Sequence, residues 1–156
     1  MIFGKRVSDY VRFQRGLLIL TLVVGLLRLA LSLGGVPNST ARFLSMTVVL
    51  LASALYYGVR VHTTGFGSYK HLLPLLEIQW ALATVIVIVA ILISAATGTE
   101  NIYSAPEYGG TLSVPAHLGG HLVFGLVLAP LVSWGVASLV MLVTKKVTGA
   151  RRVVAA

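Results

Sequence analysis

Four long apolar stretches constrain the fold of this chain more than any other feature. They cover residues 16–34, 43–61, 72–96 and 115–143. An α-helix rises about 1.5 Å per residue, so about 20 residues cross a hydrocarbon core roughly 30 Å thick. Only 10% of the residues are charged, whereas soluble domains average about 25%. We therefore expect an all-α integral membrane protein with one domain, an antiparallel bundle of four transmembrane helices.

The distribution of positive charge predicts the orientation of this bundle. Ten of the twelve lysines and arginines precede the first span, lie between the second and third, or follow the fourth. Only Arg42 falls in the opposite loops, so the positive-inside rule places both termini in the cytoplasm and the loop 97–114 outside. Anionic lipid at the cytoplasmic surface accounts for the net charge of +8 without a nucleic-acid partner.

The first 15 residues carry apolar side chains at helical spacing beside four basic ones, which predicts a basic interfacial helix at 1–15. A cleaved signal peptide is the alternative, because residues 17–27 have the length of its apolar region, but Arg28 interrupts that run. The chain has no cysteine, which excludes disulfides and thiolate ligation of metals.

Polar residues within the spans predict a buried network. Arg28 lies about 17 Å into the first span, too deep for its side chain to reach water easily. Glu77 is the only carboxylate in any span. The network is expected to comprise Arg28, Tyr56, Tyr57, Glu77 and Gln79. Such a network either fixes the helix register or relays protons, since ionisable groups inside a membrane are costly.

The loop 97–114 and the start of the fourth span predict a ligand site at the outer surface. A connection this long in a compact bundle is usually functional or disordered, and its tyrosines and prolines favour an ordered lid. His117 and His121 are four residues apart and therefore project from one helix face. The expected ligand-binding residues are Glu100, Tyr103, Glu107, Tyr108, His117 and His121.

Two kinds of occupant of this site, or none, are compatible with the sequence. His117, His121 and Glu107 form a ligand set that suits zinc or non-haem iron, so a divalent metal is one candidate cofactor. A metal-free polar ligand is the second, and a purely structural loop cap is the alternative to both. A haem would instead use His62 and His71 at the opposite membrane edge.

Two short segments resemble parts of known families. "AHLGGHLVFG", residues 116–125, resembles the histidine-bearing helix of rhomboid proteases, which implies His117 as a general base. The nearest match to the rhomboid Gly-x-Ser motif is residues 65–68, in the cytoplasmic loop. "PEY", residues 106–108, is similar to a fragment of the outer quinol site of cytochrome b, which implies a carboxylate that accepts a quinol proton.

Together these features predict a small multi-pass protein of a prokaryotic plasma membrane that binds a small ligand or metal ion. Its expected role is that of an accessory or sensory subunit, in contact with lipid and within a homo-oligomer or larger membrane complex. The main alternative is a membrane-embedded enzyme that uses the histidines and carboxylates for metal-assisted or quinone-linked chemistry. A proton-coupled carrier working through Glu77 is the second alternative.

Overall fold

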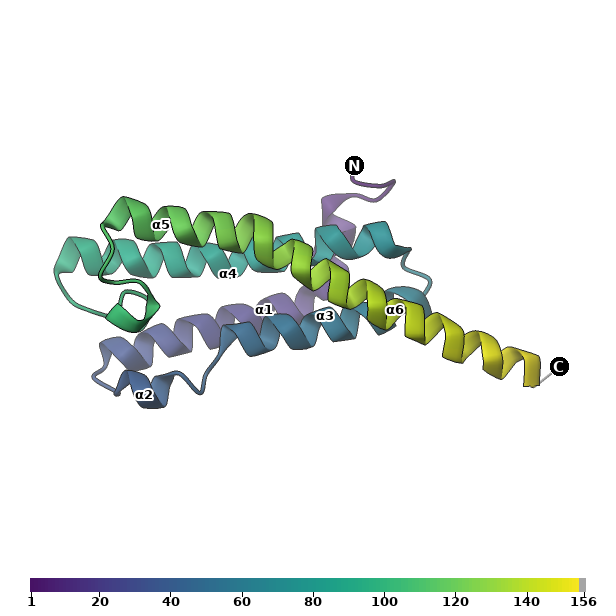
Figure 1. The fold of residues 1–156 in the computed structure, drawn as a ribbon, viewed down its shortest axis with the longest axis horizontal. Coiled ribbons are helices and arrows are strands. Elements are labelled where there is room, and N and C mark those ends of the chain that lie inside the picture. The colour runs from purple at the N-terminus through teal and green to yellow at the C-terminus, as the bar shows by residue number, and fades with distance from the viewer. Residues whose placement is uncertain (155–156) are drawn as a thin grey trace.

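A computed structural model describes the backbone of residues 1–154 and the side chains of residues 1–149, and this part of the chain is helical without strands (Figure 1). The elements are, in chain order, α1 (Val7–Leu33), α2 (Asn38–Ala41), α3 (Met46–Thr63), α4 (Tyr69–Thr97), the 3₁₀ turn η1 (Pro106–Tyr108), α5 (Val114–Val123), the π-helical turn η2 (Phe124–Leu128) and α6 (Ala129–Val154). Residues 7–15 continue directly into the first apolar stretch as the opening turns of α1.

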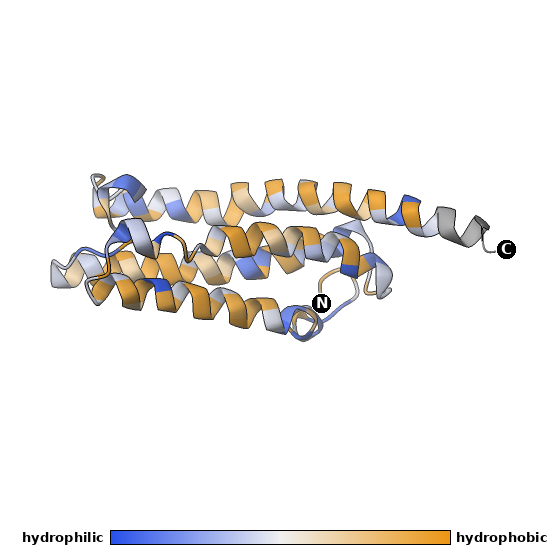
Figure 2. Ribbon diagram, turned by 90° about the horizontal axis from the view of Figure 1, so that it is seen from below, coloured by the Kyte–Doolittle hydropathy of each residue, from blue (hydrophilic) through white to orange (hydrophobic). Residues whose placement is uncertain are grey.

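Four helical segments are long and apolar enough to cross a membrane, which confirms the coarse prediction of the fold. These are Val7–Leu33, Asn38–Thr63, Tyr69–Thr97 and Val114–Gly149. The last of them comprises α5, η2 and most of α6 as one continuous rod. Apolar residues cover the middle of the rods, and hydrophilic segments gather toward their ends (Figure 2). Such a distribution is what a bilayer requires of a spanning bundle.

The last rod contacts α4 along its whole length but α3 only through α6, and this divides the bundle into two ends. We call the end that holds both termini the terminal end, and the opposite end, where residues 98–113 connect α4 to α5, the loop end (Figure 1). α6 packs against α3 toward the terminal end, whereas α5 and η2 pack against α4 at the loop end. Within residues 1–154, α5 makes no packing contact with α3.

Gly58 on α3 explains the close packing at the terminal end. A Cβ atom at this position would lie 2.6 Å from the carbonyl oxygen of Ala137 on α6. Small residues at helix contacts let two backbones approach in this way inside membranes. The rod bends away from α3 near η2, where Pro130 lacks an N–H group and its ring crowds the preceding turn.

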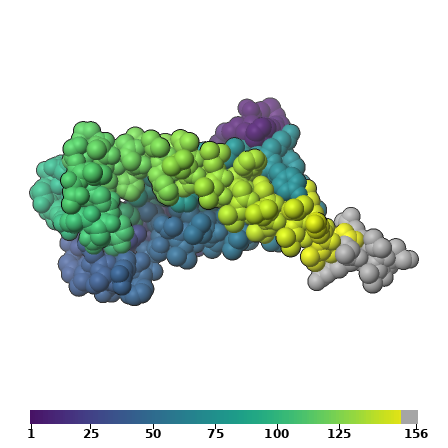
Figure 3. Space-filling model, viewed as in Figure 1, coloured from purple at the N-terminus to yellow at the C-terminus, as the bar shows by residue number. Residues whose placement is uncertain are grey.

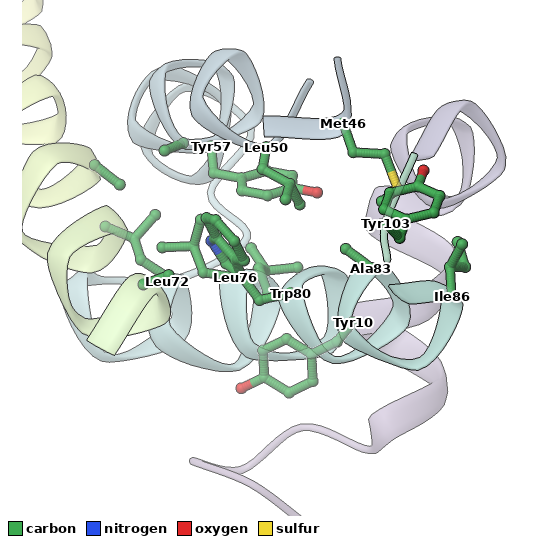
Figure 4. Packing of buried hydrophobic residues seen from close by; sticks show 14 of the residues in the cluster. Tyr10, Met46, Leu50, Tyr57, Leu72, Leu76, Trp80, Ala83, Ile86 and Tyr103 are labelled. Atoms are coloured by element: carbon green, nitrogen blue, oxygen red, sulfur yellow. The ribbon is translucent and has the colours of Figure 1, made fainter. Parts of the chain in front are cut away.

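Buried side chains from all four rods fill the centre of the bundle. Tyr57, Leu72 and Leu76 are fully or almost fully buried between α3, α4 and α6 (Figure 4). Tyr10 packs near the terminal end, where its hydroxyl donates to the carbonyl oxygen of Ile2 at 2.9 Å. The loop end differs, because Tyr103 of the connecting loop supplies core packing there.

Candidate functional site

The loop 98–113 is anchored inside the bundle rather than lying over it. Gly98 ends α4 in the left-handed conformation, with φ of 69°, which turns the chain back toward the helices. Asn101 then donates from Nδ2 to the carbonyl oxygen of Ala90 at 2.8 Å, and the Ile102 N–H donates to the Ser32 hydroxyl at 2.8 Å. These bonds tie the loop to both α4 and α1, and Ile102 is fully buried.

Tyr103 and Arg28 meet where this loop enters the bundle. The Tyr103 hydroxyl donates to the carbonyl oxygen of Gly25 at 3.1 Å. Burial raises the pKa of Tyr103 to about 12, although the nearby Arg28 guanidinium opposes the shift. Tyr103 is therefore a neutral donor at physiological pH. The Arg28 guanidinium carbon lies 5.2 Å from the Tyr103 ring centre and 5.4 Å from that of Tyr108.

A cavity of about 170 Å³ lies beneath the loop, and we call it the loop-end cavity. Arg28, Tyr103, Tyr108 and His121 are among its polar lining residues. Its other lining residues are Met46, Thr47, Leu50, Trp80, Ala83, Thr84, Val87, Phe124 and Gly125. Figure 4 shows Met46, Leu50, Trp80, Ala83 and Tyr103 converging from different elements around this space. Mostly apolar walls with a few convergent polar groups are typical of small-ligand sites.

Gly125 on η2 allows the cavity wall to close against α4. A Cβ atom at Gly125 would collide with the Thr84 side chain. The π-helical turn that contains Gly125 is a local departure from regular helix, and such turns are frequent at functional sites. The site therefore depends on a glycine and a backbone irregularity in the same turn of one rod.

The two histidines of the fourth rod lie side by side at the edge of this cavity. Their Nε2 atoms are 3.2 Å apart, so one imidazole donates to the other. His117 is 95% buried beneath the Gly109 turn, since a Cβ at Gly109 would lie 3.2 Å from its ring. A second, more open hollow of about 210 Å³ adjoins the pair, and Tyr108, His121 and Phe124 line both hollows.

The predicted metal centre is not supported by this arrangement. In the part of the chain that the structure describes, no group of three or more histidine, aspartate or glutamate side chains is placed to hold a metal ion. The histidines converge, but Glu107 and Glu100 are exposed and complete no such group with them. The sequence predicts that one of the two carboxylates faces the imidazoles; the loop residue that the structure buries in the bundle is Tyr103.

The histidines of the predicted haem pair have protein partners of their own. His62 Nε2 lies 3.1 Å from the Thr148 hydroxyl. His71 Nδ1 accepts from the Ser68 N–H at 2.9 Å, which leaves Nε2–H to donate to the carbonyl oxygen of Phe3 at 3.2 Å. His71 therefore fastens the N-terminal segment to the start of α4.

The polar residues within the spans separate into two sites. Arg28 belongs to the loop-end cavity, whose lining does not include Glu77, Gln79 or either tyrosine of α3. Glu77 is half-buried, and Tyr56 is 44% exposed with its ring 5.9 Å from the Arg60 guanidinium carbon. Tyr57 and Gln79 join a different set of residues closer to the terminal end.

We call this set the glutamine network: Gln14, Thr21, Ser53, Tyr57 and Gln79, each at most 1% exposed. Gln79 Nε2 donates to the hydroxyls of Thr21 and Ser53, both at 2.9 Å, and these hydroxyls donate to carbonyl oxygens of their own helices. That fixes Gln79 Oε1 as the acceptor for the Tyr57 hydroxyl, at 2.9 Å. The Gln14 amide lies 2.8 Å from the same hydroxyl.

One proton on the Tyr57 hydroxyl decides how Gln14 is oriented. A hydroxyl donates once, and that donation goes to Gln79, so Gln14 must donate its amide N–H to the Tyr57 oxygen. This orientation gives Gln14 Nε2 a partner and moves Oε1 to the position where Nε2 had none. The glutamine network thereby links α1, α3 and α4 by side-chain hydrogen bonds.

Comparison of the chain with protein families, with curated proteins and with solved structures finds no match.

Proposed function

We propose that this protein is a membrane-embedded binding protein that holds a small ligand in the loop-end cavity. The observation that carries the proposal is the combination of an apolar space of about 170 Å³ with Arg28, Tyr103 and His121 on its wall. A cavity near 150 Å³ accommodates a six-membered carbon ring, so this space suits a small headgroup or ring. The residues that enclose it come from four rods and a tethered loop.

The distribution of lysine and arginine supports an outward-facing cavity. Four basic residues lie toward the terminal end: Arg60, Lys70, Lys145 and Lys146. The positive-inside rule places this end in the cytoplasm. The loop end then faces the outside of a prokaryotic plasma membrane. An outward-facing binding site of this kind suits a sensory or accessory subunit that works with other membrane proteins.

Native mass spectrometry of detergent-purified protein tests this proposal. Wild type is expected to retain a small-molecule adduct, and Ala83→Leu is expected to lose it, because Ala83 is 97% buried and lines the cavity. Ala52→Leu makes the same change at an exposed position of α3 and should keep the adduct. The proposal is wrong if wild type carries no adduct or if Ala83→Leu carries the same one.

A further inference from the structure

Arg28 carries a buried positive charge without a counter-charge. Its side chain is only 8% exposed, and its Nε atom is fully buried with no hydrogen-bond partner. The chain has four carboxylates, all within the part whose side chains are described: Asp9, Glu77, Glu100 and Glu107. None of them lines the loop-end cavity. Buried charges in proteins are normally paired, because the removal of an ion from water costs roughly several kcal/mol.

The aromatic neighbours of Arg28 compensate for only part of this cost. Tyr103 and Tyr108 place their rings 5.2 and 5.4 Å from the guanidinium carbon, within the range of a cation–π attraction. A ring face accepts no strong hydrogen bond, and the Tyr103 hydroxyl, which donates to Gly25, offers the guanidinium a single neutral oxygen. The Nε–H of Arg28 still lacks an acceptor, and the guanidinium borders a space that could supply one.

We propose that the loop-end cavity binds the carboxylate of a membrane amphiphile, held by Arg28; this rests on the proposed function of the same cavity. The lining contains one permanently charged residue, which matches a monoanion rather than a doubly charged phosphate. The planar guanidinium also matches a carboxylate, since two parallel N–H groups meet its two oxygens. Leu50, Val87 and Phe124 supply apolar walls for the first carbons of the chain.

The packing of the rods gives the hydrocarbon chain a way out into the bilayer. α3 and α5 make no contact in the described structure, and the surface is hollowed between these two elements (Figure 3). Thr47 at the start of α3 and Phe124 at the start of η2 line the cavity and are both exposed. Because both belong to membrane-spanning segments, this opening faces lipid. A cavity of about 170 Å³ holds the head of an amphiphile and leaves its tail outside.

Fluorescence of Trp80 provides a direct test, because Trp80 lines the cavity and the chain has only one other tryptophan, Trp134. Trp134→Phe leaves Trp80 as the single emitter. The probes are 2-bromohexadecanoate, which carries a quenching bromine beside its carboxylate, and its uncharged methyl ester. The protein has no cysteine for the bromide to alkylate. Both probes are titrated into lipid nanodiscs that hold this protein.

The acid is expected to quench Trp80 at about a tenfold lower membrane concentration than the ester, equivalent to about 1.4 kcal/mol. Arg28→Gln should remove this preference, and Arg28→Lys should restore part of it, because lysine keeps the charge without the planar fork. Ala83→Leu should abolish quenching by both probes, and Ala52→Leu should leave it unchanged. Millimolar acetate should not relieve the quenching, because it lacks the apolar chain.

Each contrary result identifies the statement that is wrong. Equal quenching by acid and ester that Ala83→Leu abolishes overturns the carboxylate and leaves the cavity as a binding site. Quenching that survives Ala83→Leu overturns the proposed function as well. Relief by acetate means that the anion comes from water, which overturns the amphiphile and its route through the bilayer. A preference for the acid that persists in Arg28→Gln overturns the assignment of Arg28.

Discussion

The glutamine network and the loop-end cavity are both polar regions inside an apolar bundle, but they differ in the hydrogen-bond partners of their polar groups. In the network, Gln79 forms hydrogen bonds with three neighbours at once. In the cavity, Arg28 is also buried but has an unpartnered Nε and an adjoining empty volume. A closed network supports the fold, whereas an open one is suited to a ligand.

The same contrast appears in helix packing. Toward the terminal end, Gly58 brings α3 against α6 with no room for a methyl group. At the loop end the rod contacts α4 but not α3, so a space remains beside α3. The membrane contributes little hydrophobic force between helices, so the close packing of one end must support the open packing of the other.

The largest effect is expected from Gly58→Ala. Its added methyl group would lie 2.6 Å from the Ala137 carbonyl oxygen, so α3 and α6 must separate at a cost of about 3 kcal/mol. Unfolding by dodecyl sulfate in mixed micelles measures this loss. Gly120→Ala is the matched control, because a Cβ there meets nothing within 4 Å. Equal stability of the two variants would show that the terminal end is not tightly packed.

Gln79→Leu is expected to cost about 2 kcal/mol, because it removes three interhelical hydrogen bonds of about 0.6 kcal/mol each. Ser53→Ala removes one of them and should cost about a third as much. The same micellar unfolding measures both variants. A loss that is no larger in Gln79→Leu than in Ser53→Ala would contradict Gln79 as the centre of the network.

Alkaline pH should destabilise the loop end through Tyr103. Burial raises its pKa from 10.0 to about 12, so the folded state favours the protonated hydroxyl. The stabilisation is complete below pH 10 and is lost as the pH rises toward 12, reaching a loss of about 1.4 kcal/mol at pH 11. The difference in unfolding free energy between wild type and Tyr103→Phe, measured at pH 9 and pH 11, isolates this contribution. A pH-independent difference would place Tyr103 in contact with solvent.

The sequence predicts the rods well and the sites only in part. The length and hydropathy of the apolar stretches predict where the rods lie in the sequence, because a bilayer permits few alternatives to long apolar helices. Pro130 and the adjacent Gly119 and Gly120 also mark the fourth rod as irregular, although the loss of its contact with α3 at the loop end is a tertiary property.

Side-chain partners are harder to predict, since they depend on helix rotation. The sequence predicts Arg28 and Glu77 in one polar network, because both are charged residues within spans, yet Arg28 contacts Tyr103 and Tyr108 of the loop. Gln14 and Thr21 lie seven residues apart on one face of α1, and this spacing was the available signal for the network that Gln79 completes. The apolar residues that line the cavity could not be predicted from the sequence, since any of the four rods could have supplied them.

The stability of Arg28→Met, measured with and without hexadecanoate, tests the central claim most directly. Without the amphiphile, this variant should be as stable as wild type or more so, because it removes an uncompensated buried charge. Hexadecanoate should then raise the unfolding free energy of wild type alone. A large loss of stability in Arg28→Met without hexadecanoate, together with an equal response of both proteins to it, would show that Arg28 supports the fold and binds no carboxylate.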